Sequence, residues 1–294
     1  MNFIGNLRSY IIRSIIGAYS IIGTPISNGS DINVDTAWTL QEINNILDGD
    51  STTKGKNNQA DAQNLDTVNF AAGIYELPLQ RDTWFKLNIN GVNIKGDGGG
   101  NGQAWDNTIF RGADPTVGLI WEIKSSGNTF SNFRTENSQF GFVINGVDYN
   151  NINFQWIKSV DHEQHYIWEE QNNDSQTTIP SIKAQNTYVQ GGGVGFHFIE
   201  QNGATMNTKY LSFDNVTADG VSGTLIDAPL VWENGKAVLR GEFLDSVVIN
   251  SNSIFGDFYG TEFETIPDGF VEWNNGSESL YEQGIGKYNV EVDP

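Results

Sequence analysis

From residue 68 onward the chain repeats one short motif, in which a large apolar residue closely follows an asparagine. The motif begins at Asn107, Asn128, Asn151, Asn186 and Asn215, with spacings of 21, 23, 35 and 29 residues. The two shorter spacings fit one turn of a compact repeating structure, and the longer two fit a turn that carries an insertion. Asparagine tolerates the left-handed backbone angles of tight bends, and stacked asparagine side chains can bond to one another. The repeat therefore predicts an all-β fold, a right-handed parallel β-helix.

Short runs of β-forming residues separated by Gly, Asn and Asp make up the same region. We expect strands at residues 68–70, 87–94, 108–110, 119–123, 129–133, 140–144 and 152–156. In the last of these, Ile152, Phe154 and Trp156 are expected to face one way, and Asn153 and Gln155 the other. An antiparallel sandwich or jelly roll also has many short strands, but Asn-Gly hairpin turns are few in this sequence.

The N-terminal segment has a helical pattern instead. Residues 2–23 place apolar side chains at three- and four-residue steps, interrupted by Arg8 and Arg13, which predicts an amphipathic helix. Tyr19 and Ser20 break the apolar run and no small-residue cleavage site follows, so we expect a retained segment and not a signal peptide. Three roles stay open: a helix that docks to a partner or forms a trimer, an anchor at a membrane surface, or a cap over the core.

A second amphipathic helix is expected over residues 37–47, with Asp35 as its cap, and a polar surface loop over 48–66. The predicted organisation therefore has three parts. Residues 1–25 form a docking or anchor helix, residues 26–66 a capping helix with a polar loop, and residues 67–294 the β-helix with a C-terminal cap.

Charge and cysteine content limit the possible ligands. The chain has 36 acidic and 16 basic residues, a net charge of -20, and no cysteine. Such a charge repels nucleic-acid phosphates and strongly anionic polymers, which leaves neutral glycans, cationic groups and proteins as the expected partners. Adaptation to high salt is an alternative source of the acidity. The absence of cysteine excludes disulfides and thiol chemistry.

Three stretches near the start of the β region carry a family resemblance. They are residues 35–41 (DTAWTLQ), 68–77 (VNFAAGIYEL) and 92–99 (VNIKGDGG). This series resembles the opening of the pectate-lyase-like superfamily, in which a capping helix precedes a strand with a Gly-x-Tyr turn and a later Gly-x-Gly turn. Phage tailspikes, polysaccharide depolymerases and other virion proteins share that opening. The resemblance implies a parallel β-helix, whereas the Asn-Thr-Asp and Gly-His-Gly signatures of polygalacturonases do not occur in this chain.

The densest group of polar residues lies at 161–174, which we expect to be a loop in the longest repeat. Its carboxylates could supply the acid pair that glycoside hydrolysis requires, and its aromatic and amide side chains could bind a sugar. The candidate catalytic residues are Asp161, Glu163, Glu169 and Glu170. The candidate carbohydrate-binding residues are Tyr166, Trp168, Asn172, Asn173 and Gln176. The alternative is a solvated acidic loop without catalytic activity.

All three histidines lie in or near this segment. His162, His165 and His197 are weak candidates for metal ligands, because a His-x-x-His pair on a loop lacks the fixed surroundings of a metal site. We therefore expect no metal and no cofactor.

Two classes of function remain. The first is a virion spike, tail or decoration protein, expected to be a homotrimer, that docks to other virion or surface proteins through residues 1–25 and binds a neutral host-surface glycan. The second is a secreted, cell-surface or virion-borne enzyme that degrades polysaccharide as a hydrolase or lyase. The retained apolar N-terminus and the missing catalytic signatures favour the first class, and with it a non-enzymatic protein located in the virion.

Overall fold

The structure is a computed structural model of the chain. It describes residues 29–50, 52–79, 83–98, 105–145, 151–170, 177–179, 182–200, 206–208, 210–219, 221, 224–228, 235–243, 247–251, 256–259, 270–275 and 278–283. Beyond Ile167, side chains are described only for residues 183–197, 216, 219 and 221. The helix predicted over residues 1–25 lies outside the described residues. No helix in the described ranges is long and apolar enough to cross a membrane.

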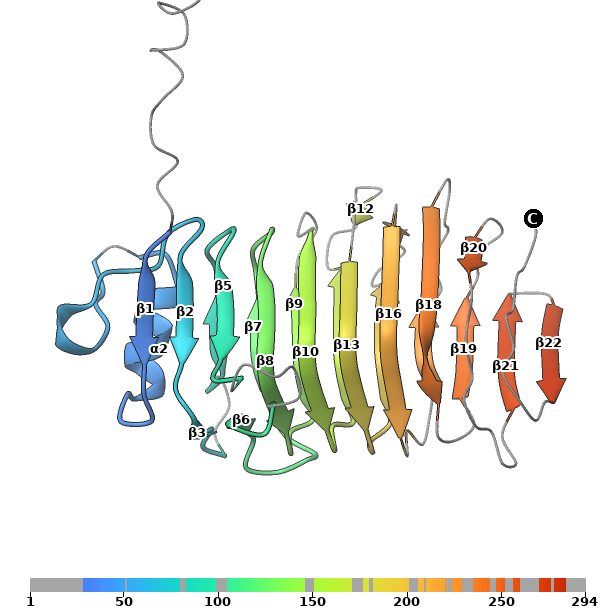
Figure 1. Cartoon of the computed structure of the whole chain (residues 1–294), viewed down its shortest axis with the longest axis horizontal. Helices are drawn as coiled ribbons and strands as arrows, with labels where there is room; N and C mark the ends of the chain where they lie inside the picture. The colour runs from blue at the N-terminus through green and yellow to red at the C-terminus, as the bar shows by residue number, and fades with distance from the viewer. Residues whose placement is uncertain are drawn as a thin grey trace, which may run out of the picture.

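The described chain forms two large β-sheets and passes alternately between them (Figure 1). Sheet A contains, in spatial order, β1 (Asp31–Val34), β2 (Thr67–Phe70), β5 (Asn93–Gly96), β8 (Thr129–Glu136), β10 (Ile152–Val160), β13 (Ile182–Gln190), β16 (Tyr210–Asp219), β18 (Gly235–Phe243) and β20 (Gly256–Tyr259). Strand β6 (Thr108–Arg111) also pairs with β8, and β3 (Gly73–Glu76) pairs with β6. Sheet B contains β4 (Phe85–Leu87), β7 (Leu119–Ile123), β9 (Phe140–Asn145), β11 (Gln164–Glu170), β14 (Val194–Glu200), β17 (Thr224–Ala228), β19 (Val247–Ser251), β21 (Phe270–Asn275) and β22 (Glu278–Gln283). A third, two-stranded sheet pairs β12 (Thr177–Ile179) with β15 (Met206–Thr208).

Pairing between the described strands is parallel, except for the last pair, β21 and β22, which is antiparallel. The prediction of parallel strands is therefore confirmed, and the alternative of an antiparallel sandwich is wrong for this part of the chain. One predicted strand, 87–94, is also wrong. It is divided between β4 in sheet B and β5 in sheet A, because Gly91 adopts a left-handed backbone with φ of +70° and turns the chain between them.

Sheet A begins earlier than residue 67. Strand β1 lies within the segment predicted to hold only a helix and a loop, and it pairs with β2 from Asp31 opposite Thr67 onward. The short helix α2 (Leu40–Leu47) follows it. Its N-cap is Thr39 and not Asp35: the Thr39 hydroxyl accepts from the Glu42 amide, and the Glu42 carboxylate accepts from the Thr39 amide. This capping box satisfies two amides of the first turn.

The loop predicted over 48–66 is only partly a surface loop. It contains a short 3-10 helix, η1 (Lys56–Asn58), and it buries Ala62 and Asp66. The Asp66 carboxylate accepts a hydrogen bond from the Gln63 amide at 2.7 Å and another from the Ser30 amide. The segment therefore ties the start of β1 to the start of β2.

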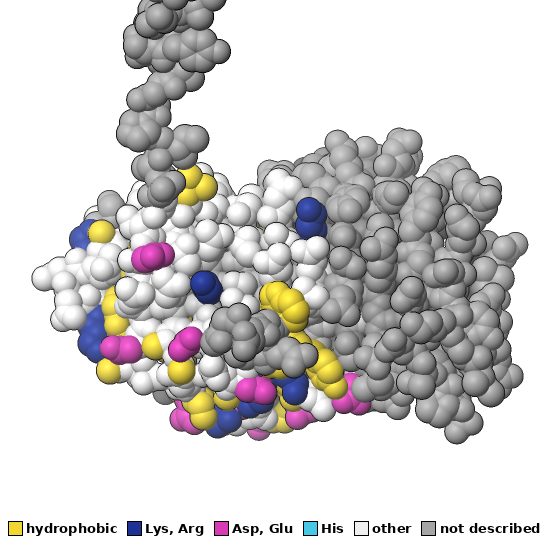
Figure 2. Space-filling model, in the orientation of Figure 1, with side chains coloured by type: hydrophobic (Ala, Val, Ile, Leu, Met, Phe, Trp, Pro, Cys, Tyr) yellow, Lys and Arg dark blue, Asp and Glu magenta, His cyan; other side chains and the backbone are white. Residues whose placement is uncertain are grey.

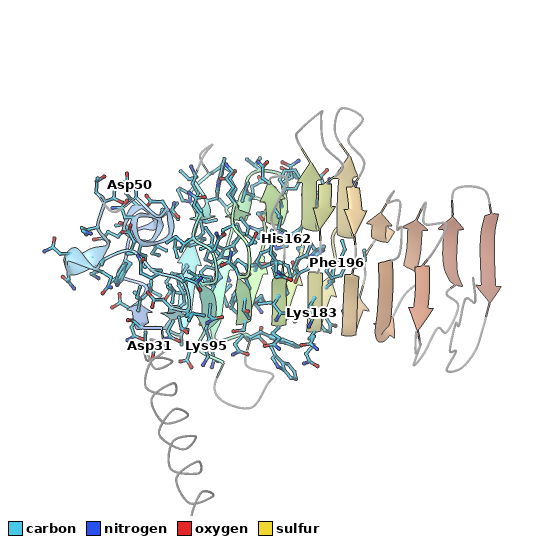
Figure 3. All side chains as sticks on the ribbon, turned by 90° about the horizontal axis from the view of Figure 1, so that it is seen from above. Asp31, Asp50, Lys95, His162, Lys183 and Phe196 are labelled. Carbon is cyan, nitrogen blue, oxygen red and sulfur yellow. The ribbon has the colours of Figure 1, made fainter. Side chains whose placement is uncertain are left out.

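The core between the sheets is aromatic. Strands β4, β7, β9, β11 and β14 of sheet B each contribute one ring in register, and rings along this column are stacked 4.6–5.0 Å apart between Phe85 and Trp121, between Phe142 and Tyr166, and between Tyr166 and Phe196. Sheet A contributes Phe70, Phe130 and Phe154 to the same core, all at most 1% exposed. Figure 3 shows Phe196 and His162 between the sheets, with Lys95 and Lys183 on the outer side of sheet A. Burial of these rings, together with the aliphatic side chains around them, stabilises the described core.

A bend repeats at the same level in neighbouring strands of sheet A. Asn132, Trp156 and Asn186 lie side by side in β8, β10 and β13, and all three have positive φ, at 61°, 55° and 51°. The prediction that Trp156 faces the same way as Ile152 and Phe154 is therefore wrong. The left-handed residue breaks the alternation, so that Trp156 is half-buried while the next residue, Ile157, enters the core.

Gly96 is expected to be essential for packing beside this bend. A Cβ atom at this position would lie 2.3 Å from the Asn132 carbonyl oxygen and 2.8 Å from the Phe133 Cβ atom, and the backbone atom cannot move aside cheaply. We expect Gly96→Ala to lower the free energy of unfolding by about 1–3 kcal/mol, measured by urea denaturation. The control is Gly118→Asn, where φ is +80° and no atom lies within 4 Å of the added Cβ. Equal midpoints for the two variants would contradict the packing argument.

Candidate functional site

The outward side chains of sheet A form two rows that run across the strands. The first row contains Asp31, Thr67, Asn93, Thr129 and Asn153, and the second contains Asn33, Asn69, Lys95, Ser131 and Gln155, in each case one residue per strand in register. The residues between them, such as Val68 and Phe154, are buried. Figure 2 shows this face as largely neither hydrophobic nor charged, with only isolated charges.

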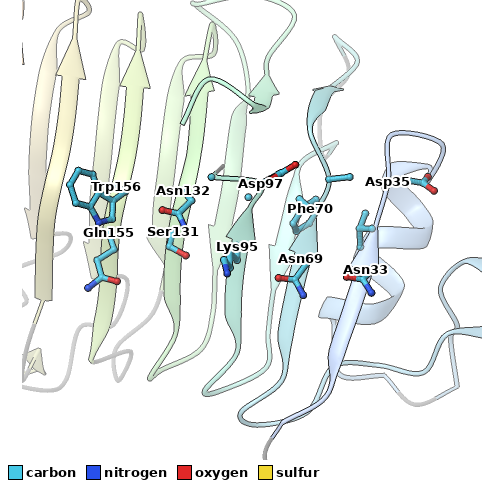
Figure 4. A pocket seen from close by; sticks show the side chains of 14 residues that line it. Asn33, Asp35, Asn69, Phe70, Lys95, Asp97, Ser131, Asn132, Gln155 and Trp156 are labelled. Carbon is cyan, nitrogen blue, oxygen red and sulfur yellow. The ribbon is translucent and has the colours of Figure 1, made fainter. Parts of the chain in front are cut away.

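The second row lines a groove of about 840 Å³ (Figure 4). The groove crosses β1, β2, β5, β8 and β10, and its remaining lining comes from Val34, Asp35, Phe70, Ala71, Gly96, Asp97, Gly98, Asn132 and Trp156. Most lining side chains are amides, hydroxyls or small residues. Amide side chains both donate and accept hydrogen bonds, so the groove can bind a ligand that does the same.

Three charged side chains line the groove. Lys95 lies in its centre, between Asn69 and Ser131, and among the described residues it takes part in no ion pair. Asp35 and Asp97 lie on one wall, and Asp35 is 3.6 Å from the Lys56 ammonium group. Of the two lining carboxylates, Asp35 is thus partly neutralised by Lys56, and Asp97 remains with Lys95 as the other charges of the lining.

An aromatic side chain closes the groove at β10. Trp156 is half-buried, and its ring centroid is 6.3 Å from that of Trp105, which in turn is 6.2 Å from Tyr188. A left-handed backbone is unusual for so bulky a residue, and such backbones concentrate at functional sites. A tryptophan face at the end of a polar groove is a surface on which a sugar ring can stack.

The segment predicted to hold the site, residues 161–174, is not the expected loop. Residues 164–170 form strand β11 in the middle of sheet B. Tyr166 is fully buried in the aromatic column between Phe142 and Phe196, so its selection as a sugar-binding residue is wrong. Its neighbours in register, and not its own sequence context, place it there.

The other predicted residues of this segment remain predictions. Asp161 and Glu163 lie exposed in the turn between β10 and β11, and the Glu163 carboxylate accepts from the Gln139 side chain at 2.9 Å. Glu169, Glu170 and Trp168 belong to β11, but their side chains are not among those described. Asn172, Asn173 and Gln176 lie outside the described residues.

Two of the histidines are buried structural groups. The His162 Nε2 atom is 3.1 Å from the Thr135 hydroxyl, and its Nδ1 is 3.0 Å from the Ser138 hydroxyl. The His165 Nε2 atom is 3.0 Å from the Gly191 carbonyl oxygen, and its Nδ1 is 2.8 Å from the Ser159 hydroxyl. Both side chains are 0% exposed and both ring nitrogens of each are engaged, so neither ring can bind a metal without losing these contacts.

His197 is placed apart from this pair. It lies in β14, half-buried, with Nδ1 2.8 Å from the Gln164 side-chain oxygen. No group of three or more His, Cys, Asp or Glu residues suited to a metal occurs in the described part of the chain. The candidacy of His197 as a metal ligand stays a prediction.

Sequence reasoning missed the groove, although a signal was present. Four segments, 31–34 (DINV), 67–70 (TVNF), 93–96 (NIKG) and 129–131 (TFS), alternate a polar residue with an apolar or small one, and their polar positions are mostly Asn, Thr or Ser. Aligning these segments with one another would have predicted the two rows. Comparison with protein-family models, with curated proteins and with solved structures finds no match to this chain.

Proposed function

We propose that the two sheets are faces of a right-handed parallel β-helix of the pectate-lyase-like type. Three observations support this. Strands pair in parallel in both large sheets except for the last pair, the chain alternates between these sheets from β6 to β21, and the left-handed bend recurs at Asn132, Trp156 and Asn186. Stacked turns with residues in this conformation are what a repeating coil requires.

The function that the geometry supports best is glycan binding without cleavage. The observation that carries it is the groove across five strands, lined by Asn, Ser and Gln side chains and closed by Trp156. A neutral glycan offers hydroxyl groups that both donate and accept, and a ring face for tryptophan. The net charge of -20 disfavours phosphate-rich ligands such as nucleic acids.

In this proposal the protein is a virion spike, tail or decoration protein. It docks to other virion or surface proteins through residues 1–25, acts as a homotrimer, and holds host-surface glycan in the groove. The second candidate, a polysaccharide-degrading enzyme at the cell surface or outside the cell, rests on carboxylates: Asp161, Glu163, Glu169 and Glu170 from the sequence, together with Asp35 and Asp97 in the groove.

The variant Trp156→Asn tests the binding proposal. Asparagine tolerates the left-handed backbone and already occupies this position in the two neighbouring strands, so the fold should be retained with an unchanged or higher unfolding midpoint. Loss of the aromatic face should weaken binding by about tenfold or more, which corresponds to about 1.4 kcal/mol. Binding is measured against a panel of neutral polysaccharides, with a parallel assay for new reducing ends and unsaturated products.

The matched control is Asn153→Ala, in the same strand and on the outward face but outside the groove. It should bind as the parent protein does. Equal binding by Trp156→Asn and the parent would remove the groove from the proposal. Release of reducing ends or unsaturated products by the parent would replace binding alone with the enzyme alternative.

A further inference from the structure

The geometry of the groove also restricts the shape of its ligand, and this inference rests on the proposed function. The row Asn33, Asn69, Lys95, Ser131 and Gln155 is straight in register, because each residue is the direct partner of the next across the sheet. Figure 4 shows these side chains one after another along the groove. A ligand that contacts all of them must extend across the strands.

The spacing of the row is that of the strands, ~4.8 Å. One pyranose in an extended β-(1→4)-linked chain advances by nearly the same distance, because both of its linkage bonds are equatorial. An α-(1→4)-linked chain of the same sugar curves into a helix, so it can touch two or three strands but not five in a line. The row therefore matches one sugar per strand only for an extended chain.

The lining chemistry indicates an uncharged chain. The amides and the hydroxyl of the row can each pair with sugar hydroxyls, and Lys95 adds a donor at the centre. Asp35 and Asp97 both line the groove, and their charges oppose a ligand that carries a carboxylate on every sugar. Trp156 supplies the only indole face among the lining residues. One end of the glycan can therefore stack on it at β10.

We propose that the groove binds an uncharged, extended β-(1→4)-linked glycan, with about one sugar on each of the five strands and one end stacked on Trp156. Binding starts at the tryptophan. Short oligosaccharides occupy the β10 end, and only longer ones reach Asn33 on β1.

The test uses the full chain and two series of oligosaccharides that contain only glucose: cello-oligosaccharides, which are β-(1→4)-linked, and malto-oligosaccharides, which are α-(1→4)-linked. Isothermal titration at pH 7 should show affinity for the cello series rising with each sugar up to about five and then levelling. Maltohexaose should bind at least tenfold more weakly than cellohexaose. Equal or tighter binding of maltohexaose, or no gain beyond cellobiose, would overturn the inference.

Two variants test where along the groove the glycan binds. Asn33→Ala should weaken cellohexaose binding several-fold and leave cellotriose unchanged, because a trisaccharide anchored at Trp156 does not reach β1. Thr67→Ala, in the outward row beside the groove, should change neither. An equal loss for the trisaccharide and the hexasaccharide in Asn33→Ala would contradict the placement.

Failure of this inference is distinguishable from failure of the proposed function. Binding of another neutral glycan that Trp156→Asn weakens, together with no binding of cellohexaose, leaves the function and removes the extended β-(1→4) chain. Absence of binding to every neutral glycan in the panel removes both.

Discussion

Acidification is expected to unfold this protein through two histidines. Burial is the main cause that lowers the pKa of His162 from 6.5 to about 4 and that of His165 to about 3. For His162, hydrogen bonds with Ser138 and Thr135 and the charge of Glu136 oppose this effect more weakly. His165 is further disfavoured as a cation by His162, whose ring centroid is 5.3 Å away.

The direction of the pH dependence follows from proton binding. In the unfolded chain both imidazoles take up protons as the pH falls through 6.5, whereas in the folded chain they remain neutral until about pH 4 or below. The unfolded state therefore binds more protons in this window, and the free energy of unfolding decreases as the pH falls. The expected loss is on the order of 5 kcal/mol between pH 6.5 and pH 4, comparable with the whole stability of many proteins.

Urea denaturation at half-unit pH steps measures this loss. In the double variant His162→Asn, His165→Asn, the slope between pH 6.5 and pH 4.5 should be much shallower, whatever its stability at pH 7. Proton NMR of the folded parent gives an independent measurement, in which two imidazole resonances should not titrate above pH 5. Titration of all three histidines near pH 6.5 would contradict the buried, neutral pair.

Removal of one ring from the aromatic column is expected to have a similarly large effect. Phe142 is 0% exposed, stacks on Tyr166 at 5.0 Å and contacts Phe154 edge-on at 4.9 Å. Phe142→Ala removes the transfer free energy of the ring and leaves a cavity that stacked neighbours held by two sheets cannot fill. We expect a loss of about 3–5 kcal/mol in the free energy of unfolding.

The matched control is Phe140→Ala. Phe140 lies in the same strand, two residues earlier, but it is half-exposed, so its replacement should lower the stability by about 1 kcal/mol. Urea midpoints at pH 7 compare the two variants. A loss at position 142 no larger than that at position 140 would show that the column contributes little.

The strands were predictable because their signal is local. Alternation of polar and apolar residues in 129–133 and the apolar run of 119–123 fix which segments become strands, and β7 has the predicted bounds. The recurring asparagines predicted the turns less reliably, because they do not all occupy the same position relative to a strand. Asn128 precedes β8 and fixes the turn through its side chain, which accepts from the Val92 amide at 2.8 Å, whereas Asn186 lies at the bend within β13. The repeat therefore combined two different turns.

The candidate site was not predictable from any single segment. Asn69 and Lys95 are ordinary polar residues of short strands, one half-buried and the other exposed, and only their pairing in register places them in one groove. The acidic residues of 161–174 were predicted to form a site because they are close together in sequence. Within β11, however, pairing in register with Phe142 and Phe196 places Tyr166 in the core, and burial with four hydrogen-bonding contacts makes His162 and His165 part of the interior.

The sequence by itself determined the local properties of this protein: the alternation that makes strands, the helix with its Thr39 capping box, the turns at glycine and asparagine, and a net charge of -20. Tertiary structure alone decided which strands became neighbours and in what register. Hydrogen bonds between strands join residues such as Gln155 and Gln185, 30 positions apart, and no local propensity specifies that distance. The register then decided that Tyr166 is buried, that Trp156 faces the groove, and that five separate strands present one continuous polar row.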